Sequence, residues 1–250
     1  MKVKIILVSQ PQPVELEKSP YSELIKKFGV TLEFRKFITI EGIPAKEFRA
    51  DRINILDFSA VIFTSRNAVD HFFRISKEMR IDVPDSMKYF SISESTAYYL
   101  QKYVQYRKRK VFHSKESFIN LIELIKKHKT EKFLLPCSDI HKLEIPKMLD
   151  ENKIYYRKAI IYKTLASDLS DIDIRKYDLL VFFSPAGIKS LFKNFPDFIQ
   201  NETAIGAFGP TTAKAVTDAG LTLNIPAPTK TAPSMAMAIE QYLQNESKKK

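Results

Sequence analysis

Short apolar segments alternate with amphipathic segments along the chain, and this alternation constrains the fold more than any other feature. The segments 60–64, 132–136 and 178–184 are mostly continuous apolar runs, rich in β-branched or aromatic residues, as in strands that are buried on both faces. The intervening segments carry apolar residues at helical spacing. Several of them begin with Ser or Ser-Pro, which favours a helix start. Strands that alternate with helices predict an α/β fold with parallel sheets.

Two of the predicted strands are unusual. The full set of predicted strands is 2–9, 31–38, 60–64, 88–92, 110–113, 132–136, 153–164, 178–184 and 203–208. The runs 31–38 and 153–164 mix basic and apolar residues and exceed the typical strand length of about 5–6 residues. We expect such strands to leave one domain and enter another.

An internal repeat supports two domains. The matching segments, given in chain order, are 60–73 with 179–192, 92–100 with 208–216, and 114–122 with 231–239. The last match places Ser117 opposite Ser234. Three matches at a nearly constant offset predict two homologous halves. We expect residues 1–36 plus 166–250 to form one domain and 43–158 to form an inserted domain, with linker strands at about 37–42 and 159–165.

The composition limits the possible partners and the compartment. Forty Lys and Arg against 29 Asp and Glu give a formal net charge of +11, which favours anionic ligands. The single cysteine, Cys137, excludes an intrachain disulfide and a Cys-based zinc site, and it indicates a reducing compartment. No run approaches the roughly 18–20 apolar residues of a membrane helix. We therefore expect a cytoplasmic protein with no membrane partner.

Standard catalytic and cofactor motifs are missing from the sequence. It contains no G-x-x-x-x-G-K-[ST], G-x-G-x-x-G, G-x-S-x-G or H-E-x-x-H, and no obvious pair of acid/base carboxylates emerges. His141 follows Cys137 at a spacing that a metal could accept, but two ligands do not make a site. The sequence therefore predicts no metal and no cofactor.

Hydroxyl side chains recur where helices begin. They are Ser65, Ser93, Ser95, Thr96, Ser114 and Ser117 in one half, and Ser184, Thr211, Thr212, Thr231 and Ser234 in the other. Helix capping explains each one taken singly. Taken together, they are expected at the carboxyl edges of two parallel sheets, where free N–H groups bind anions. This pattern predicts a ligand with several carboxylates.

Several of these segments together resemble the uroporphyrinogen-III synthase family. The similar segments are VIFTSRNAVDHF, the region 133–164 that ends in Tyr-Lys-Thr, VFFSPAGIKSLF, and the region from AIGAFGPTTA to the helix that starts at Pro233-Ser234. The last is the most specific. Their order and spacing extend the resemblance over most of the chain.

The resemblance implies two flavodoxin-like parallel-sheet domains joined by a two-stranded β linker. It implies a cofactor-independent lyase of haem and porphyrin biosynthesis that cyclises hydroxymethylbilane, which has eight carboxylates, to uroporphyrinogen III with inversion of ring D. It also implies site residues. Tyr162 would assist departure of the hydroxyl group, and the substrate carboxylates would bind Ser65, Thr96, Ser184, Thr211, Thr212 and Ser234.

Two other functions stay open at this point. A relative of the family could bind tetrapyrroles without cyclising them. The basic run RKRK at 107–110, with Tyr98, Tyr99, Tyr103 and Tyr106 nearby, could bind nucleic acid, but no recognised nucleic-acid motif accompanies it. We expect a monomer that acts on its small-molecule substrate without an obligate protein partner and without nucleic acid.

Overall fold

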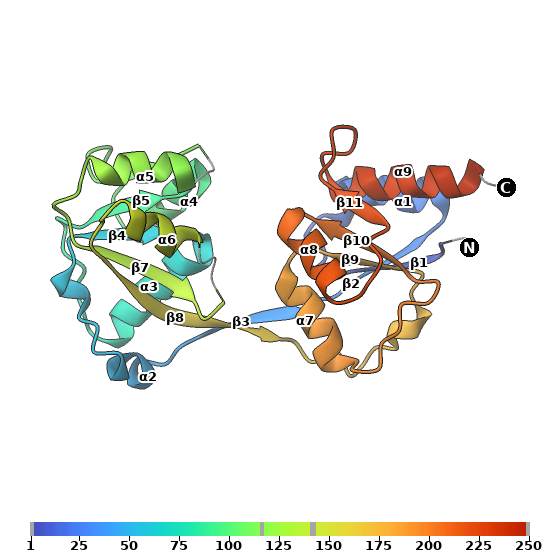
Figure 1. The fold of residues 1–250 in the computed structure, drawn as a ribbon, viewed down its shortest axis with the longest axis horizontal. Coiled ribbons are helices and arrows are strands. Elements are labelled where there is room, and N and C mark those ends of the chain that lie inside the picture. The colour runs from blue at the N-terminus through green and yellow to red at the C-terminus, as the bar shows by residue number, and fades with distance from the viewer. Residues whose placement is uncertain (1–2, 116–117, 141–143, 249–250) are drawn as a thin grey trace. The chain divides into compact units, whose positions relative to one another are not determined.

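The computed structural model describes residues 3–115, 118–140 and 144–248, so Ser117 and His141 lie outside the described residues. The chain divides into two compact units (Figure 1). Unit 1 comprises Met1–Thr39 and Leu165–Lys250, and unit 2 comprises Ile40–Thr164. Among the described helices, none is long and apolar enough to cross a membrane.

Unit 1 is built on a five-stranded sheet. Its strands, in spatial order, are β11 (Ile225–Ala227), β10 (Ala204–Phe208), β9 (Leu179–Phe182), β1 (Ile5–Val8) and β2 (Thr31–Phe34). All neighbouring strands pair in parallel. Counted along the chain within the unit, the order is 2-1-3-4-5, which is the flavodoxin-like order.

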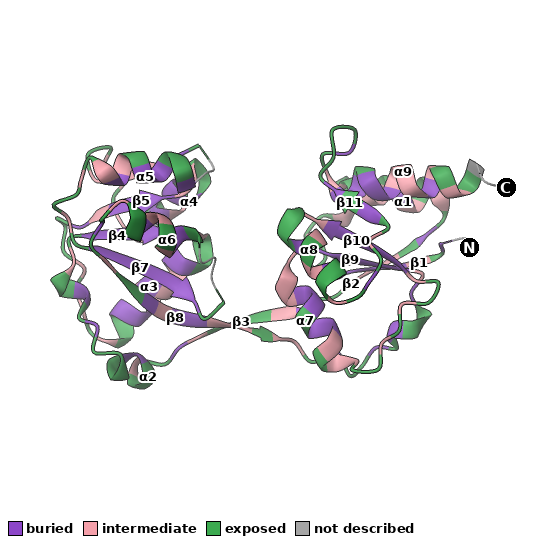
Figure 2. Ribbon diagram, in the orientation of Figure 1, coloured by how far each residue is buried: buried purple, intermediate pink, exposed green. Residues whose placement is uncertain are grey.

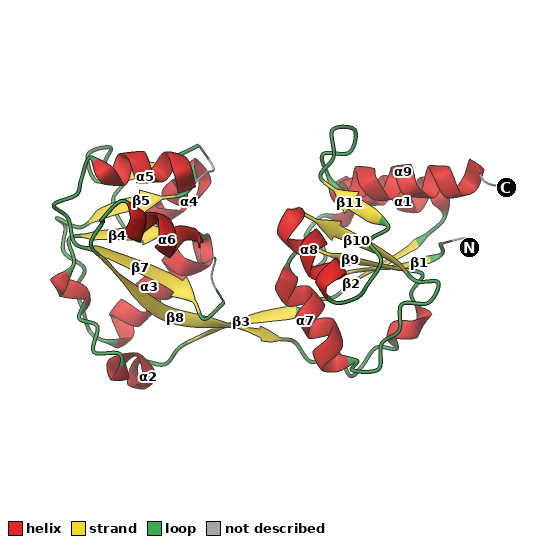
Figure 3. Ribbon diagram, viewed as in Figure 1, coloured by secondary structure: helices red, strands yellow, loops and turns green. Residues whose placement is uncertain are grey.

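Helices cover both faces of this sheet (Figure 3). They are α1 (Pro20–Phe28), α7 (Pro185–Asn194), α8 (Pro210–Asp218) and α9 (Met235–Lys248), with short 3₁₀ turns at η1 (Leu16–Lys18) and η4 (Ile174–Lys176). Leu24 of α1 and Ile239 of α9 pack into the apolar layer on one face. Ile188 of α7 and Val216 of α8 pack into the layer on the other face. Proline at the first position of three helices suits their starts, because the first N–H has no helical partner.

Unit 2 is built on a six-stranded sheet. Its strands, in spatial order, are β3 (Ile38–Gly42), β8 (Tyr156–Ala166), β7 (Phe133–Ser138), β4 (Ala60–Phe63), β5 (Lys88–Ser91) and β6 (Val111–His113). The pairs from β8 to β6 are all parallel. β4 and β7 are buried along their whole length (Figure 2), as their continuous apolar sequences predict.

The helices of unit 2 also form two layers. They are α2 (Ala45–Ala50), α3 (Arg66–Glu78), α4 (Glu94–Tyr99), α5 (Phe118–Lys126) and α6 (Glu144–Glu151), with 3₁₀ turns at η2 (Ile55–Asp57) and η3 (Leu100–Lys102). Phe48, Phe72 and Ala97 place α2, α3 and α4 against one apolar layer. Leu121 and Leu149 place α5 and α6 against the other.

The predicted α/β class with parallel sheets is confirmed, but the single strand predicted at 31–38 is wrong. β2 ends at Phe34, and β3 begins at Ile38. Phe37 separates them, because its ring is buried in unit 1 against Phe182, with ring centroids 5.5 Å apart. The short strand β11 was not predicted. Its Pro226 weakens the strand pattern, and proline is tolerated there because β11 is an edge strand.

Candidate active site

A cavity of about 210 Å³ lies in unit 2 at the carboxyl ends of β4, β7 and β8. From β4 the chain crosses to β5, and from β7 it crosses the other way, to β8. Neighbouring strands with opposite crossovers form a topological switch point, where α/β sheets bind their ligands. The cavity is lined by Thr64, Ser65, Ile92, Leu135, Cys137, Ser138, Ile140, Ile145, Pro146 and Tyr162.

Tyr162 supplies the phenol of this cavity. Its side chain is 7% exposed, and its hydroxyl oxygen lies 3.4 Å from Oγ of Ser65. Its ring stacks on the imidazole of His71, with centroids 5.1 Å apart. Burial raises the pKa of Tyr162, so the phenol keeps its proton at neutral pH. The cavity therefore contains a neutral O–H donor.

Ser65 joins the cavity to the start of α3. Its Oγ accepts the N–H of Ala68 at 3.1 Å, so Ser65 is the N-cap of the helix. A hydroxyl that accepts in this way still has its own proton to donate. Two predicted site residues that are 97 positions apart, Ser65 and Tyr162, therefore meet at one place.

A β-bulge sets the position of Tyr162 on β8. Cys137 of β7 pairs with Ile160 of β8, but the next residue, Ser138, pairs with Tyr162. Ile161 is thus one extra residue in β8. Bulges of this kind re-aim side chains and are common beside active sites. The bulge gives no signal in the sequence, because one extra residue within a strand leaves no distinct pattern of residue types.

A second polar group stands where β7 and β8 end, and sequence reasoning missed it. Ser138 Oγ donates to Asp139 Oδ1 at 2.7 Å and lies 3.0 Å from the hydroxyl of Thr164. Burial raises the pKa of Asp139, but hydrogen bonds from Ser138 and from the N–H groups of Thr164 and Ile140 outweigh it, and the net result is a lowered pKa. The Ser-Asp pair directly after a buried strand was the available signal.

Thr96 lies one strand away, at the start of α4. The N-cap there is Ser93, whose Oγ accepts the N–H of Thr96 at 3.3 Å and lies 3.1 Å from the Thr96 hydroxyl. Thr96 is 5% exposed. The structure therefore places the Thr96 hydroxyl in an internal pair, with Ser93 more exposed at the same helix start.

The corresponding switch point of unit 1 lies between β1 and β9. Ser184 follows β9 and caps α7, since its Oγ accepts the N–H of Gly187 at 3.3 Å. Ser9 follows β1, and its N–H donates to the carbonyl of Val181 at 2.9 Å. A Cβ on Gly187 would lie 3.8 Å from both serine hydroxyls, so the two hydroxyls flank this glycine. Sequence reasoning named Ser184 but counted Ser9 as part of a strand.

The remaining predicted residues follow β10 and β11. Thr211 and Thr212 lie in the first turn of α8, whose N-cap is Gly209 with φ of 87°. Gly209 has no side chain to cap the helix, so these first-turn amides receive no cap from it. Thr212 is 1% exposed, whereas Thr211 is exposed. Ser234 precedes α9, and its Oγ accepts the N–H of Met237 at 3.2 Å.

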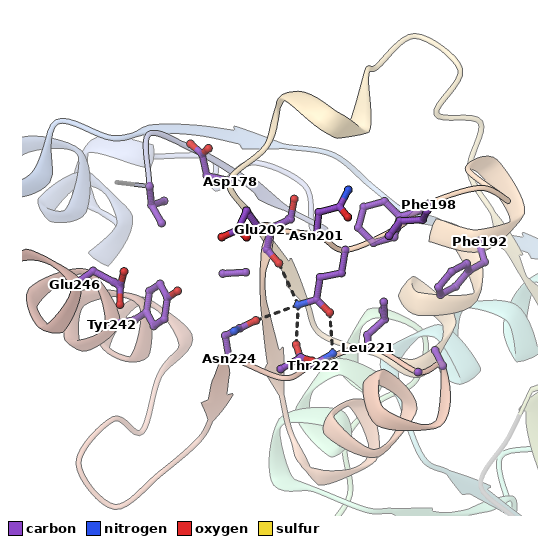
Figure 4. Close-up of a pocket in the computed structure, with 17 residues that line it drawn as sticks. Asp178, Phe192, Phe198, Asn201, Glu202, Leu221, Thr222, Asn224, Tyr242 and Glu246 are labelled. Atoms are coloured by element: carbon purple, nitrogen blue, oxygen red, sulfur yellow. Dashed lines mark hydrogen bonds between the residues drawn. The ribbon is translucent and has the colours of Figure 1, made fainter. Parts of the chain in front are cut away.

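A larger hollow of about 610 Å³ lies at the opposite, amino edge of the unit 1 sheet (Figure 4). Several of its polar groups bind one another. Gln200 donates to the carbonyls of Thr203 and Thr222 and accepts the N–H of Thr222. Asp178 accepts the N–H groups of Lys4 and Ile5. These contacts lie beside the amino ends of the strands and connect neighbouring segments of unit 1.

The tyrosines near the basic run 107–110 are partly engaged within the unit. The hydroxyls of Tyr99 and Tyr103 both donate to Asp70, which also accepts from Lys102. Tyr98 stacks on Tyr106 with centroids 5.8 Å apart, and it is 53% exposed. Within the described ranges, no group of three or more His, Cys, Asp or Glu residues is arranged to hold a metal.

Comparison with known proteins gives a family and two similar structures. Residues 19–237 match the family model described as Uroporphyrinogen-III synthase HemD. A uroporphyrinogen-III synthetase from Helicobacter pylori is 19% identical, with a TM-score of 0.62 over 97% of this chain and 99% of that one. A mutant uroporphyrinogen III synthase from Thermus thermophilus is 17% identical, with a TM-score of 0.59 over 97% and 99%. No curated protein sequence matches the chain. At these identities the two structures establish a shared fold.

Proposed function

The chain belongs to the uroporphyrinogen-III synthase family, and we propose that the cavity beside Tyr162 is where it carries out that family's reaction. The enzyme is a cyclising lyase. Its substrate would be hydroxymethylbilane, the linear tetrapyrrole with eight carboxylates, and its product uroporphyrinogen III. We place the reaction in the cytoplasm, as the single buried thiol of Cys137 suits a reducing compartment.

The main requirement of the reaction is that the protein orients the substrate. Loss of the terminal hydroxyl as water leaves an electrophilic azafulvene at ring A. Attack by the substituted carbon of ring D forms a spiro intermediate, which fragments and recloses with ring D inverted. The electron pairs come from the pyrroles themselves, and the only net loss is one water. Binding that fixes the reacting carbons is therefore the main contribution the enzyme makes.

The observation that carries the proposal is the protonated phenol of Tyr162 in a small cavity. A neutral phenol can donate its proton or a hydrogen bond to a departing hydroxyl group. The cavity of about 210 Å³ is below the range of roughly 300–1,000 Å³ that is usual for whole ligands. Only one end of a linear tetrapyrrole fits it, and the hydroxymethyl end is the one that needs this donor.

The other predicted residues are proposed as carboxylate contacts. Ser65 and Ser184 each cap a helix at a switch point, and Thr211 and Thr212 lie in a first turn that no side chain at the N-cap position covers. Thr96 and Ser234 lie at further helix starts. N–H groups and hydroxyls at helix starts bind carboxylates without a metal, which suits a substrate with eight of them.

The test is a coupled cyclisation assay. Porphobilinogen and its deaminase generate hydroxymethylbilane, the protein is added, and the oxidised porphyrins are separated by isomer. We expect an excess of the type III isomer over the spontaneous type I isomer, and a kcat about tenfold lower for Tyr162→Phe, below the roughly 10²–10⁴ range of full general acid catalysis. Tyr155→Phe is the matched control, because Tyr155 directly precedes β8 and is 62% exposed.

The outcomes separate the proposals. Type I isomer alone, from folded protein, would refute the enzymatic function and favour a relative that binds tetrapyrroles without cyclising them. Type III isomer with an unchanged kcat for Tyr162→Phe would keep the function and refute the role of Tyr162.

A further inference from the structure

We propose that Arg74 and His71 are positioning residues that hold Tyr162 in its working orientation. This inference rests on the proposed function, since it assigns a role in the same reaction. Neither residue lines the cavity, and both lie on α3, behind Tyr162. Both would act through Tyr162 rather than on the substrate.

Arg74 binds the backbone at the bulge and at the end of the neighbouring strand β3. Its Nη2 donates to the carbonyl of Ile161 at 3.1 Å and to the carbonyl of Ile43 at 2.9 Å. The Ile161 carbonyl also accepts the N–H of Ile43 at 3.0 Å. Ile161 is the extra residue of β8 and directly precedes Tyr162. The guanidinium therefore fastens the bulge that directs the tyrosine.

The same guanidinium orients the ring on which Tyr162 stacks. Nε of Arg74 donates to Nδ1 of His71 at 3.1 Å, and the His71 and Tyr162 rings are 23° from parallel. An arginine N–H cannot accept a hydrogen bond. Nδ1 must therefore be unprotonated, which leaves the proton on Nε2. The bond fixes both the plane and the tautomer of the imidazole.

Burial and the guanidinium of Arg74 keep this imidazole neutral. Burial, followed by the positive charge of Arg74, lowers the pKa of His71, against opposing contributions from Asp70 and Glu78. Glu78 accepts from Nη1 of Arg74 at 2.5 Å, so it partly neutralises the guanidinium that faces His71. A protonated His71 would direct Nδ1–H at the Nε–H of Arg74 and break the arrangement.

Gly42 makes the space for the guanidinium. A Cβ built on Gly42 would lie 2.6 Å from both Cζ and Nε of Arg74, far inside van der Waals contact. The φ of Gly42 is not among the positive values, so backbone conformation does not require glycine here. The residue is small because Arg74 occupies the place where a side chain would be.

The test is a double-mutant cycle between His71 and Tyr162. His71→Phe keeps a ring for stacking but removes the acceptor of Arg74. Because coupled residues are non-additive, we expect kcat to fall about fourfold in the wild-type background and less than twofold in the Tyr162→Phe background. KM should stay within about twofold in both, since neither residue contacts substrate. His128→Phe is the matched control, a histidine of the same unit that packs on Phe90 and Phe112.

A second measurement does not depend on activity. The ¹⁵N chemical shifts of His71 should report an unprotonated Nδ1 and a protonated Nε2 at neutral pH, and Arg74→Met should abolish this preference. Equal losses of kcat in both backgrounds, or a protonated Nδ1, would overturn the proposal. If the wild type makes only type I isomer, the proposed function fails while the shifts still decide the arrangement of Arg74 and His71.

Discussion

Gly42→Ala tests whether Arg74 needs the empty space beside it. An ordinary contact requires 3.4 Å or more, and the new Cβ would start at 2.6 Å from Cζ and Nε of Arg74. The guanidinium must therefore move by about 1 Å, and its bonds to the Ile43 and Ile161 carbonyls, now 2.9 and 3.1 Å, cannot both survive.

The expected loss of unfolding free energy follows from those two hydrogen bonds. A hydrogen bond from a charged donor contributes roughly 1.5–3 kcal/mol, and the Arg74 side chain is 29% exposed, so water replaces part of the loss. We expect unit 2 to lose about 2–3 kcal/mol of unfolding free energy, which for a unit of this size lowers Tm by roughly 6–15 °C. Differential scanning calorimetry on the full chain measures this directly.

The Arg74→Met background supplies the control. In Arg74→Met, the new alanine contacts a flexible apolar side chain, and the φ of residue 42 is one that alanine adopts without strain. Gly42→Ala should therefore change Tm by less than about 2 °C in this background. A similar drop in both backgrounds would place the cost in the backbone of β3. If Gly42→Ala lowers Tm by less than about 2 °C in the wild-type background, Arg74 moves aside freely. Either result would refute the reasoning.

Three further predictions follow from local contacts. Ser65→Ala removes the N-cap of α3 and should lower the unfolding free energy by about 1 kcal/mol in a urea titration; no change would mean that water caps the helix equally well. Hydrogen bonds from Tyr177 and Lys176 lower the pKa of Glu33, so its contribution to stability is present above the ordinary carboxyl pKa and is lost as pH falls through the lowered pKa. The Tm of Glu33→Gln should therefore fall less than that of the wild type between about pH 5 and pH 3, and parallel curves would contradict this. Burial raises the pKa of Cys137 to about 11, so iodoacetamide at pH 8 should alkylate it slowly in the folded protein and rapidly in urea; rapid reaction without urea would show that the cavity opens.

The sequence predicts local features of this protein well. The alternation of apolar runs and capped helices identified eight of the observed strands to within a few residues, and the start of β2, because continuous burial leaves a continuous apolar pattern. The prediction failed at 31–38, because in the sequence Phe37, a buried aromatic residue beyond the end of a strand, cannot be distinguished from one within a strand. Ser65 and Tyr162 were named from their motif segments, and the structure brings them together.

The support around Tyr162 could not be predicted from the sequence. Arg74 binds backbone carbonyls 31 and 87 residues away. Every residue has a carbonyl, so no feature of the sequence distinguishes these two. Gly42 has no positive φ and lies in no turn, so it carries no local signal of its own. His71 reads as one more residue on a helix. Each of these roles depends on tertiary contacts that leave no periodicity along the chain.

Because of the bulge, the placement of Tyr162 depends on the number of residues in β8 as well as on their identity. One residue fewer between Ile160 and Tyr162 would give a regular ladder with β7, and every side chain that remained would still be compatible with a strand. The tyrosine would keep Ser138 as its partner, but the extra residue that re-aims its side chain and the Ile161 carbonyl that Arg74 binds would both be gone. Deletion of Ile161 alone would therefore leave the phenol of Tyr162 in the sequence and take away the backbone support that aims it at Ser65.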